Sequence, residues 1–169
     1  MSEIREARLQ KANSLISKGF ASYAESFTVS HTTKFLIQKF DYLENGQEES
    51  FNVSIAGRVM AKRVMGKIAF FTISDQDGQI QLYLDKRIIN RNLENEILLS
   101  FEDLKEIVDI GDWIGVYGNI KKTNKGELSI KVEKWEMLSK SLKPLPDKWH
   151  GLTDIEKRYR QRYLDLIVN

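Results

Sequence analysis

Two neighbouring segments place an aromatic ring and a carboxamide on the same predicted surface. Apolar residues alternate in IAFFTIS (68–74) and QIQLYLD (79–85), as in strands that bury one face. The opposite phase carries Phe70 in the first segment and Gln81 and Tyr83 in the second. A phenylalanine ring offers a stacking surface worth roughly 1–3 kcal/mol per base, and a glutamine can both donate to and accept from a base edge. The pattern indicates a face for single-stranded nucleic acid.

Basic side chains flank this face in two groups. The first group, in the preceding strand and the turn after it, is Arg58, Lys62, Arg63 and Lys67. The second group, around the turn TNKG, is Lys121, Lys122 and Lys125. Glu127, Ser129 and Lys131 are expected to point outward from the strand that follows. Basic residues on both sides of an aromatic face predict a groove that binds phosphates.

Each feature also has an ordinary structural explanation when it is taken alone. Phe70 would suit packing beneath the N-terminal segment, and Tyr83 would suit packing on a neighbouring side chain. Glutamines are common on solvated strands, and lysines are common at hairpin tips. Only the joint placement on one face favours nucleic-acid binding over a solvated surface.

The elements that position these residues follow the order strand, strand, strand, helix, strand, strand. Strand-like alternation covers 51–61, 68–74, 79–85, 113–122 and 127–138, and helical spacing covers about 93–108. This order predicts a mainly β fold, the five-stranded Greek-key barrel of the OB-fold, with a helix between strands three and four. An SH3-like barrel is the alternative, but it usually lacks so long a helix there.

Segments outside the barrel predict a helix at each end of the chain. Ser2 and Gly19 suit the start and end of an N-terminal helix, and residues 1–49 are read as a helical extension of a barrel at 50–140. Pro144 and Pro146 mark a linker. Residues 141–169 are therefore expected to hold this linker, a helix, and the start of a second domain that the chain lacks.

Composition excludes several functional classes. The chain has no Cys and two His, which argues against disulfides, thiolate zinc sites and cysteine nucleophiles. The net charge of +2 is too small to indicate nucleic-acid binding by itself. There is neither a signal-peptide pattern nor an apolar run long enough for a bilayer, so a soluble cytoplasmic protein is expected, with no membrane partner. No catalytic or metal-binding motif is evident, and no cofactor is expected in this chain.

Residues 144–168, PLPDKWHGLTDIEKRYRQRYLDLIV, closely resemble the junction between the two domains of bacterial-type class II lysyl-tRNA synthetases. The barrel segments AGRVMAKRVMGKIAF, GQIQLY and TNKGELSI and the N-terminal RLQKANSLISKGF are also similar to that family. Aspartyl and asparaginyl enzymes share the barrel and RYLDL but lack the PDKWHGL–RYRQ context, so they rank second.

The resemblance implies an anticodon-binding domain and roles for four residues. In the family, Phe70 would stack on the central U of the anticodon, Gln81 and Arg63 would hydrogen-bond it, and Glu127 would contact neighbouring bases. The full-length enzyme would be a homodimer that attaches lysine to tRNA(Lys) using ATP and Mg²⁺. The family's ATP- and lysine-binding residues have no counterpart here, so this chain alone is expected to be inactive.

Two other readings remain open. The chain would also suit a free-standing OB module that binds single-stranded nucleic acid, or a protein-interaction domain whose terminal segments serve oligomerisation. The expected helix RYRQRYLDLIV favours the first reading, because a free OB module does not need it.

Overall fold

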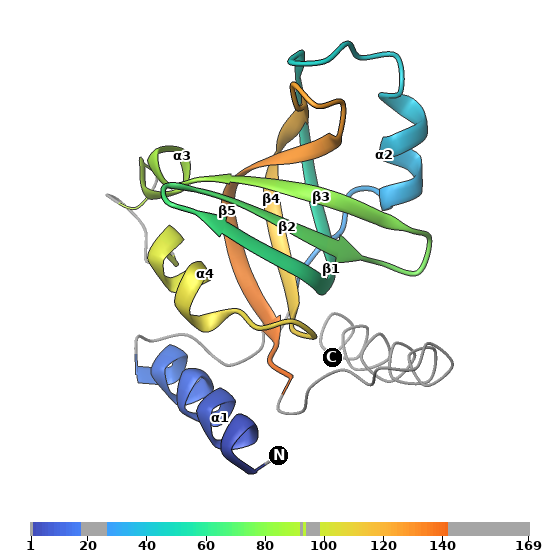
Figure 1. Cartoon of the computed structure of the whole chain (residues 1–169). Helices are drawn as coiled ribbons and strands as arrows, with labels where there is room; N and C mark the ends of the chain where they lie inside the picture. The colour runs from blue at the N-terminus through green and yellow to red at the C-terminus, as the bar shows by residue number, and fades with distance from the viewer. Residues whose placement is uncertain (1, 18–26, 92, 94–98, 142–169) are drawn as a thin grey trace.

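The computed structural model describes residues 2–17, 27–91, 93 and 99–141 (Figure 1). The helices are α1 (Ser2–Ser17), α2 (Thr33–Lys39), α3 (Lys86–Arg91) and α4 (Phe101–Ile107). The strands are β1 (Glu48–Met65), β2 (Ile68–Ser74), β3 (Gln79–Asp85), β4 (Trp113–Lys122) and β5 (Leu128–Ser139). The expected helix between strands three and four is therefore present.

The five strands close into a barrel in the order β1-β2-β3-β5-β4. The long β1 pairs antiparallel with β2 through its second half and with β4 mainly through its first half. β3 closes the ring by pairing parallel with β5. This topology confirms the predicted mainly β, five-stranded OB-type architecture.

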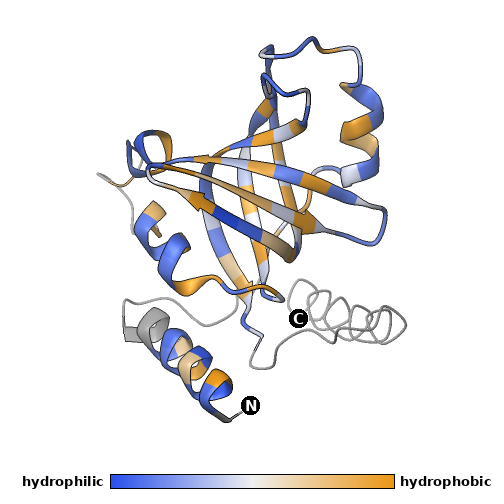
Figure 2. Ribbon diagram, in the orientation of Figure 1, coloured by the Kyte–Doolittle hydropathy of each residue, from blue (hydrophilic) through white to orange (hydrophobic). Residues whose placement is uncertain are grey.

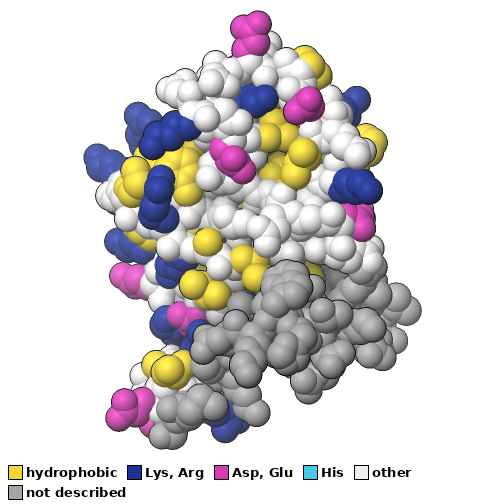
Figure 3. Space-filling model, turned by 45° about the vertical axis from the view of Figure 1, so that its right-hand side comes forward, with side chains coloured by type: hydrophobic (Ala, Val, Ile, Leu, Met, Phe, Trp, Pro, Cys, Tyr) yellow, Lys and Arg dark blue, Asp and Glu magenta, His cyan; other side chains and the backbone are white. Residues whose placement is uncertain are grey.

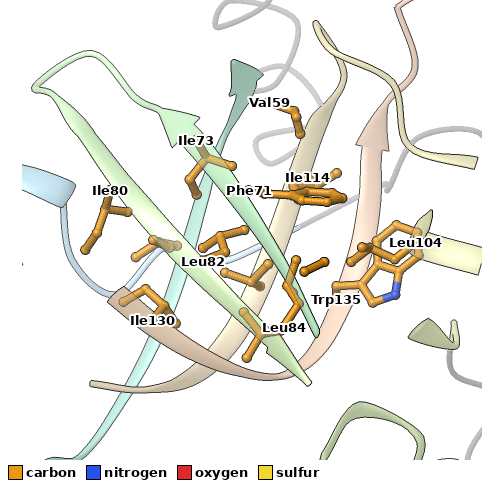
Figure 4. Close-up of a cluster of buried hydrophobic side chains, with 14 of the residues drawn as sticks. Val59, Phe71, Ile73, Ile80, Leu82, Leu84, Leu104, Ile114, Ile130 and Trp135 are labelled. Carbon is orange, nitrogen blue, oxygen red and sulfur yellow. The ribbon is translucent and has the colours of Figure 1, made fainter. Parts of the chain in front are cut away.

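The barrel interior is filled by the inward phase of the strands. Figure 4 shows Phe71, Ile73, Leu82 and Ile130 turned toward one another between the strands. Buried and more accessible residues alternate along β2 and along most of β3, and in Figure 2 hydrophilic residues interrupt the hydrophobic ones along β3, which is the pattern of strands with one buried face. The alternation read from the sequence is thus correct for both strands, and Phe70, Gln81 and Tyr83 lie on the outer phase.

The helix α4 packs on the barrel through Phe101, Leu104 and Ile107. Its first turn is fixed by a capping box, in which the Ser100 hydroxyl accepts from the Asp103 N–H and the Asp103 carboxylate accepts from the Ser100 N–H. The predicted single helix over about 93–108 is too long. Within the described residues, α3 continues directly from β3, and α4 begins only at Phe101.

The segment before β1 contributes more to the fold than an extension would. Leu36 and Phe40 around α2, and Leu43 after it, belong to the same buried cluster as the barrel core. The expected division at residue 49 falls inside β1, which begins at Glu48. The sequence reading overlooked α2, because its helical spacing of apolar residues lasts only two turns. The predicted linker and helix in 142–169 lie outside the described residues.

Candidate nucleic-acid interface

Three side chains from three strands form a continuous row on the outside of the barrel. The strand register pairs Arg63 of β1 with Phe70 of β2, and Phe70 with Tyr83 of β3. The Phe70 and Tyr83 rings meet edge to face with centroids 5.8 Å apart, and the Arg63 guanidinium lies 5.3 Å from the Phe70 ring centre. Phe70 and Tyr83 are half-buried and Arg63 is exposed. An accessible aromatic pair with a cation over one ring is a surface on which a flat base can stack.

A β-bulge decides which basic residue of β1 reaches this row. The register of β1 against β2 shifts between Val59 and Ala61, so Met60 is an extra residue. After Met60, even-numbered residues of β1 take the inner face of the strand and odd-numbered residues take the outer face, which is the opposite of the order before it. Arg63 pairs with Phe70 on the outer face, whereas Lys62 pairs with Phe71, which belongs to the core.

Lys62 was predicted to bind phosphates, and the structure corrects that prediction. Its Nζ donates to the backbone carbonyls of Lys105 at 2.5 Å and Val108 at 2.7 Å, at the C-terminal end of α4. Burial lowers the pKa of its ammonium group from the ordinary value. The ammonium group of this half-buried lysine is therefore engaged by carbonyls at the end of α4.

The prediction that Arg58 lies on the accessible face is also wrong. Arg58 does point away from the barrel interior, paired with Ser74 and Trp113, but its relative exposure is 0%. Phe27 and Trp113 form a second buried cluster on this part of the outer surface, together with Ala56 and Leu138. Alternation shows the direction of a side chain but not whether another segment covers it.

Gln81 lies two residues before Tyr83 on the same face of β3, and a short chain of hydrogen bonds holds its side chain. Its Nε2 donates to the Ser129 hydroxyl at 2.9 Å, and that hydroxyl donates to the backbone carbonyl of Glu127 at 3.2 Å. Orienting the amide nitrogen toward β5 leaves the amide oxygen available to accept from a ligand. The Gln81 side chain is thus connected through Ser129 to the backbone of Glu127.

Glu127 belongs to a compact turn between β4 and β5. The Thr123 N–H donates to the Glu127 carbonyl at 3.0 Å, and the Thr123 hydroxyl accepts from the Glu127 N–H at 3.1 Å. Gly126 takes φ = +92°, a conformation that disfavours other residues. The Glu127 side chain itself is exposed, as expected for a residue that reaches a ligand.

The remaining predicted basic residues lie in two turns or at the end of the strand that leads into one. Lys67 is exposed in the two-residue turn from β1 to β2, where Gly66 has φ = +68°. Lys125 is exposed in the turn after β4, and Lys122 is half-buried with its Nζ 3.3 Å from the Asp41 carbonyl. Lys121 lies 5.1 Å from the Tyr83 ring centre. In Figure 3, Lys and Arg side chains surround hydrophobic groups along one side of the molecule.

Two charged residues of this surface were not singled out from the sequence. Glu48 accepts from Lys121 Nζ at 3.0 Å and from Lys131 Nζ at 2.8 Å, and these lysines, Lys131 first, lower the pKa of its carboxyl group. Alternation had already placed Lys131 outward, whereas Glu48 fell within the extension predicted for residues 1–49. Recognising that β1 begins at Glu48 would have brought the carboxylate next to Lys121, its register partner.

The described ranges contain no group of three or more His, Asp or Glu residues that could hold a metal ion. No helix among them is both long and apolar enough to cross a bilayer.

Comparisons with known proteins agree with this geometry. Residues 53–138 match the tRNA anticodon family model, described as an OB-fold nucleic acid binding domain. The chain is 92% identical over its whole length to a lysine–tRNA ligase of Prochlorococcus marinus strain MIT 9312 and 56% identical to that of strain MIT 9303. It is 54% identical to a lysine–tRNA ligase of a Synechococcus species, strain RCC307.

The chain spans about a third of the length of these relatives. The family model, in contrast, covers half of the chain and coincides with the closed barrel from Val53 in β1 to Leu138 in β5. This chain therefore belongs to the tRNA anticodon family of OB-fold nucleic acid binding domains.

Proposed function

We propose that this chain is the anticodon-binding part of a lysine–tRNA ligase and that the outer face of β2 and β3 receives the central base of the tRNA(Lys) anticodon. The row Arg63–Phe70–Tyr83 carries the proposal, because it joins a stacking surface to a cation on one accessible face. The similarity of the whole chain to lysine–tRNA ligases supports lysine as the amino acid of the full protein.

In this proposal, each residue has a distinct task. Phe70 stacks on the central U, while Gln81 and Arg63 supply hydrogen bonds to its edge. Gln81 is oriented for this by Ser129, so its amide oxygen accepts from the N–H of U. Glu127, whose backbone carbonyl accepts from Ser129 and whose side chain is exposed, contacts the adjacent anticodon bases.

Phosphate binding falls to lysines at the edges of the face, of which Lys67 and Lys125 are exposed and Lys121 and Lys122 are half-buried. Lys67 lies beyond the Arg63 side of the row, and Lys121, Lys122 and Lys125 lie beyond the Tyr83 side. Arg58 and Lys62 take no part, because one is buried and the other is bonded to α4.

For the whole protein, the proposal implies a class II enzyme that is larger than this chain. The catalytic part, with ATP and Mg²⁺, would lie in the two-thirds of the relatives' length that this chain does not cover. The enzyme would act as a cytoplasmic homodimer on tRNA(Lys).

Replacing the stacking ring tests the proposal. Phe70→Ala should weaken binding of a fluorescein-labelled tRNA(Lys) anticodon stem-loop by about 1–3 kcal/mol, measured by fluorescence anisotropy. The melting temperature should change little, because Phe70 lies outside the core cluster. Phe35→Ala removes an exposed ring from α2 and serves as the control, with unchanged affinity. Equal affinity of the Phe70→Ala variant and the unaltered protein would remove the stacking assignment.

A further inference from the structure

A carboxylate joins two lysines at the end of the aromatic row. Glu48 Oε1 is 2.8 Å from Lys131 Nζ, and Glu48 Oε2 is 3.0 Å from Lys121 Nζ. The same Lys121 ammonium lies 5.1 Å from the ring centre of Tyr83, whose ring packs edge to face with that of Phe70. The charged group is therefore continuous with the surface proposed to stack bases.

The backbone fixes this convergence of charges. Glu48 is the register partner of Lys121, and Lys131 is the register partner of Tyr83. On the other side of Glu48, the Lys122 N–H donates to the Gln47 carbonyl at 2.8 Å. The strands thus bring the carboxylate and both ammonium groups together, and only side-chain rotation is needed to separate them.

The arrangement has the charge and shape of a phosphate site that is already occupied. Two ammonium groups donate to the two oxygens of one singly charged anion, and a phosphodiester offers two such non-bridging oxygens with the same charge. The Glu48 side chain is 44% exposed, whereas the lysines are more enclosed at 19% and 30%. Exposed ion pairs hold weakly, so Glu48 can turn into water while the lysines stay in place.

We propose that Lys121 and Lys131 form a binding site for a backbone phosphate of the RNA strand, and that Glu48 occupies this site in the free protein and is displaced when RNA binds. The inference rests on the proposed function, since the phosphate belongs to a nucleotide next to the base that stacks on Phe70. Glu48 acts as an internal competitor, so RNA gains this contact only when the rest of the strand is also in place.

The test uses two anticodon stem-loops, one with U and one with C at the central position. Glu48→Gln keeps the side-chain size but removes the competing charge. It should tighten binding of both RNAs by the same factor, about three- to tenfold at low salt. The slope of log affinity against log salt should steepen by about 0.7, the value for one single-strand phosphate. Glu106→Gln makes the same charge change on the exposed side of α4 and should alter neither quantity.

Adding Lys131→Met to Glu48→Gln should reverse the gain in affinity, because one of the two ammonium groups is then lost.

If Glu48→Gln leaves both affinities unchanged or weakens them, Glu48 does not compete and the phosphate site is wrong. If it tightens only one RNA, Glu48 contacts the base instead, and the site is also wrong. Equal binding of the two RNAs by the unaltered protein contradicts recognition of the central base. In that case, tighter binding of both RNAs by Glu48→Gln still supports the phosphate site. Binding of neither RNA would overturn both proposals.

Discussion

At the scale of single residues, Phe70 and Gln81 point outward from the barrel because β2 and β3 pair without interruption along their length. Period-two alternation was therefore enough to predict the direction of both side chains. The same rule failed for Lys62, since the bulge at Met60 reverses the phase of β1. It also could not show that Arg58 is covered, because burial on the outer surface depends on segments distant in sequence.

Gln81 provides the prediction at this scale. Gln81→Ala should reduce the discrimination between U and C at the central base to within about twofold, because alanine can neither donate to nor accept from the base edge. Anisotropy titrations with the two stem-loops measure this ratio. Gln79→Ala alters an exposed glutamine at the start of the same strand and should keep the ratio. Discrimination that survives Gln81→Ala would assign base reading to another residue.

At the scale of elements, the barrel and α4 could be predicted, whereas the links between elements could not. The bulge gives neighbouring residues of β1 opposite tasks, with Lys62 bound to α4 and Arg63 over Phe70. Similarly, Asp75 in the DQDG turn (75–78) between β2 and β3 anchors the start of α2, which is distant in sequence. Neither link leaves a periodic pattern in the sequence.

The two neighbours in β1 should respond oppositely to the same substitution. Lys62→Met should lower the free energy of unfolding by about 1–3 kcal/mol, because two carbonyls at the end of α4 lose their donor. Its RNA affinity per folded molecule should be unchanged. Arg63→Met should weaken RNA binding but leave stability within about 0.5 kcal/mol. Urea unfolding and stem-loop titration of both variants measure these effects. If Lys62→Met weakened RNA binding and Arg63→Met lowered stability, the bulge would not separate the two residues in this way.

Asp75 should stabilise the protein, because its carboxylate joins the start of α2 to the turn between β2 and β3. Its carboxylate accepts from the Thr33 N–H and hydroxyl at 2.9 and 2.8 Å, and from the N–H groups of Asp77 and Gly78. Asp75→Ala leaves the fully buried Thr33 without this acceptor and should cost about 2–4 kcal/mol. Asp77→Ala, in the same turn but exposed, should cost no more than about 0.5 kcal/mol. Chemical denaturation that gave equal losses for both variants would argue against this anchor.

At the scale of the whole molecule, a closed barrel carries an accessible aromatic row with lysines at both edges of one face. The family match establishes an OB-fold nucleic acid binding domain, and the local geometry explains why this face would hold a base. Only the resemblance to lysyl-tRNA synthetases indicates that the bound base is the central U of the anticodon and that the RNA is tRNA(Lys). The protein's selectivity for the anticodon is therefore the central claim.

The most direct test is a paired titration of the unaltered protein with the tRNA(Lys) anticodon stem-loop and the same stem-loop carrying C in place of the central U. The account predicts that the U-containing RNA binds more tightly by about 1–3 kcal/mol, about 5- to 150-fold, because the hydrogen-bonding edges of the two bases differ at the atoms that Gln81 and Arg63 would contact. Equal affinity for the two stem-loops at the same salt concentration would contradict it.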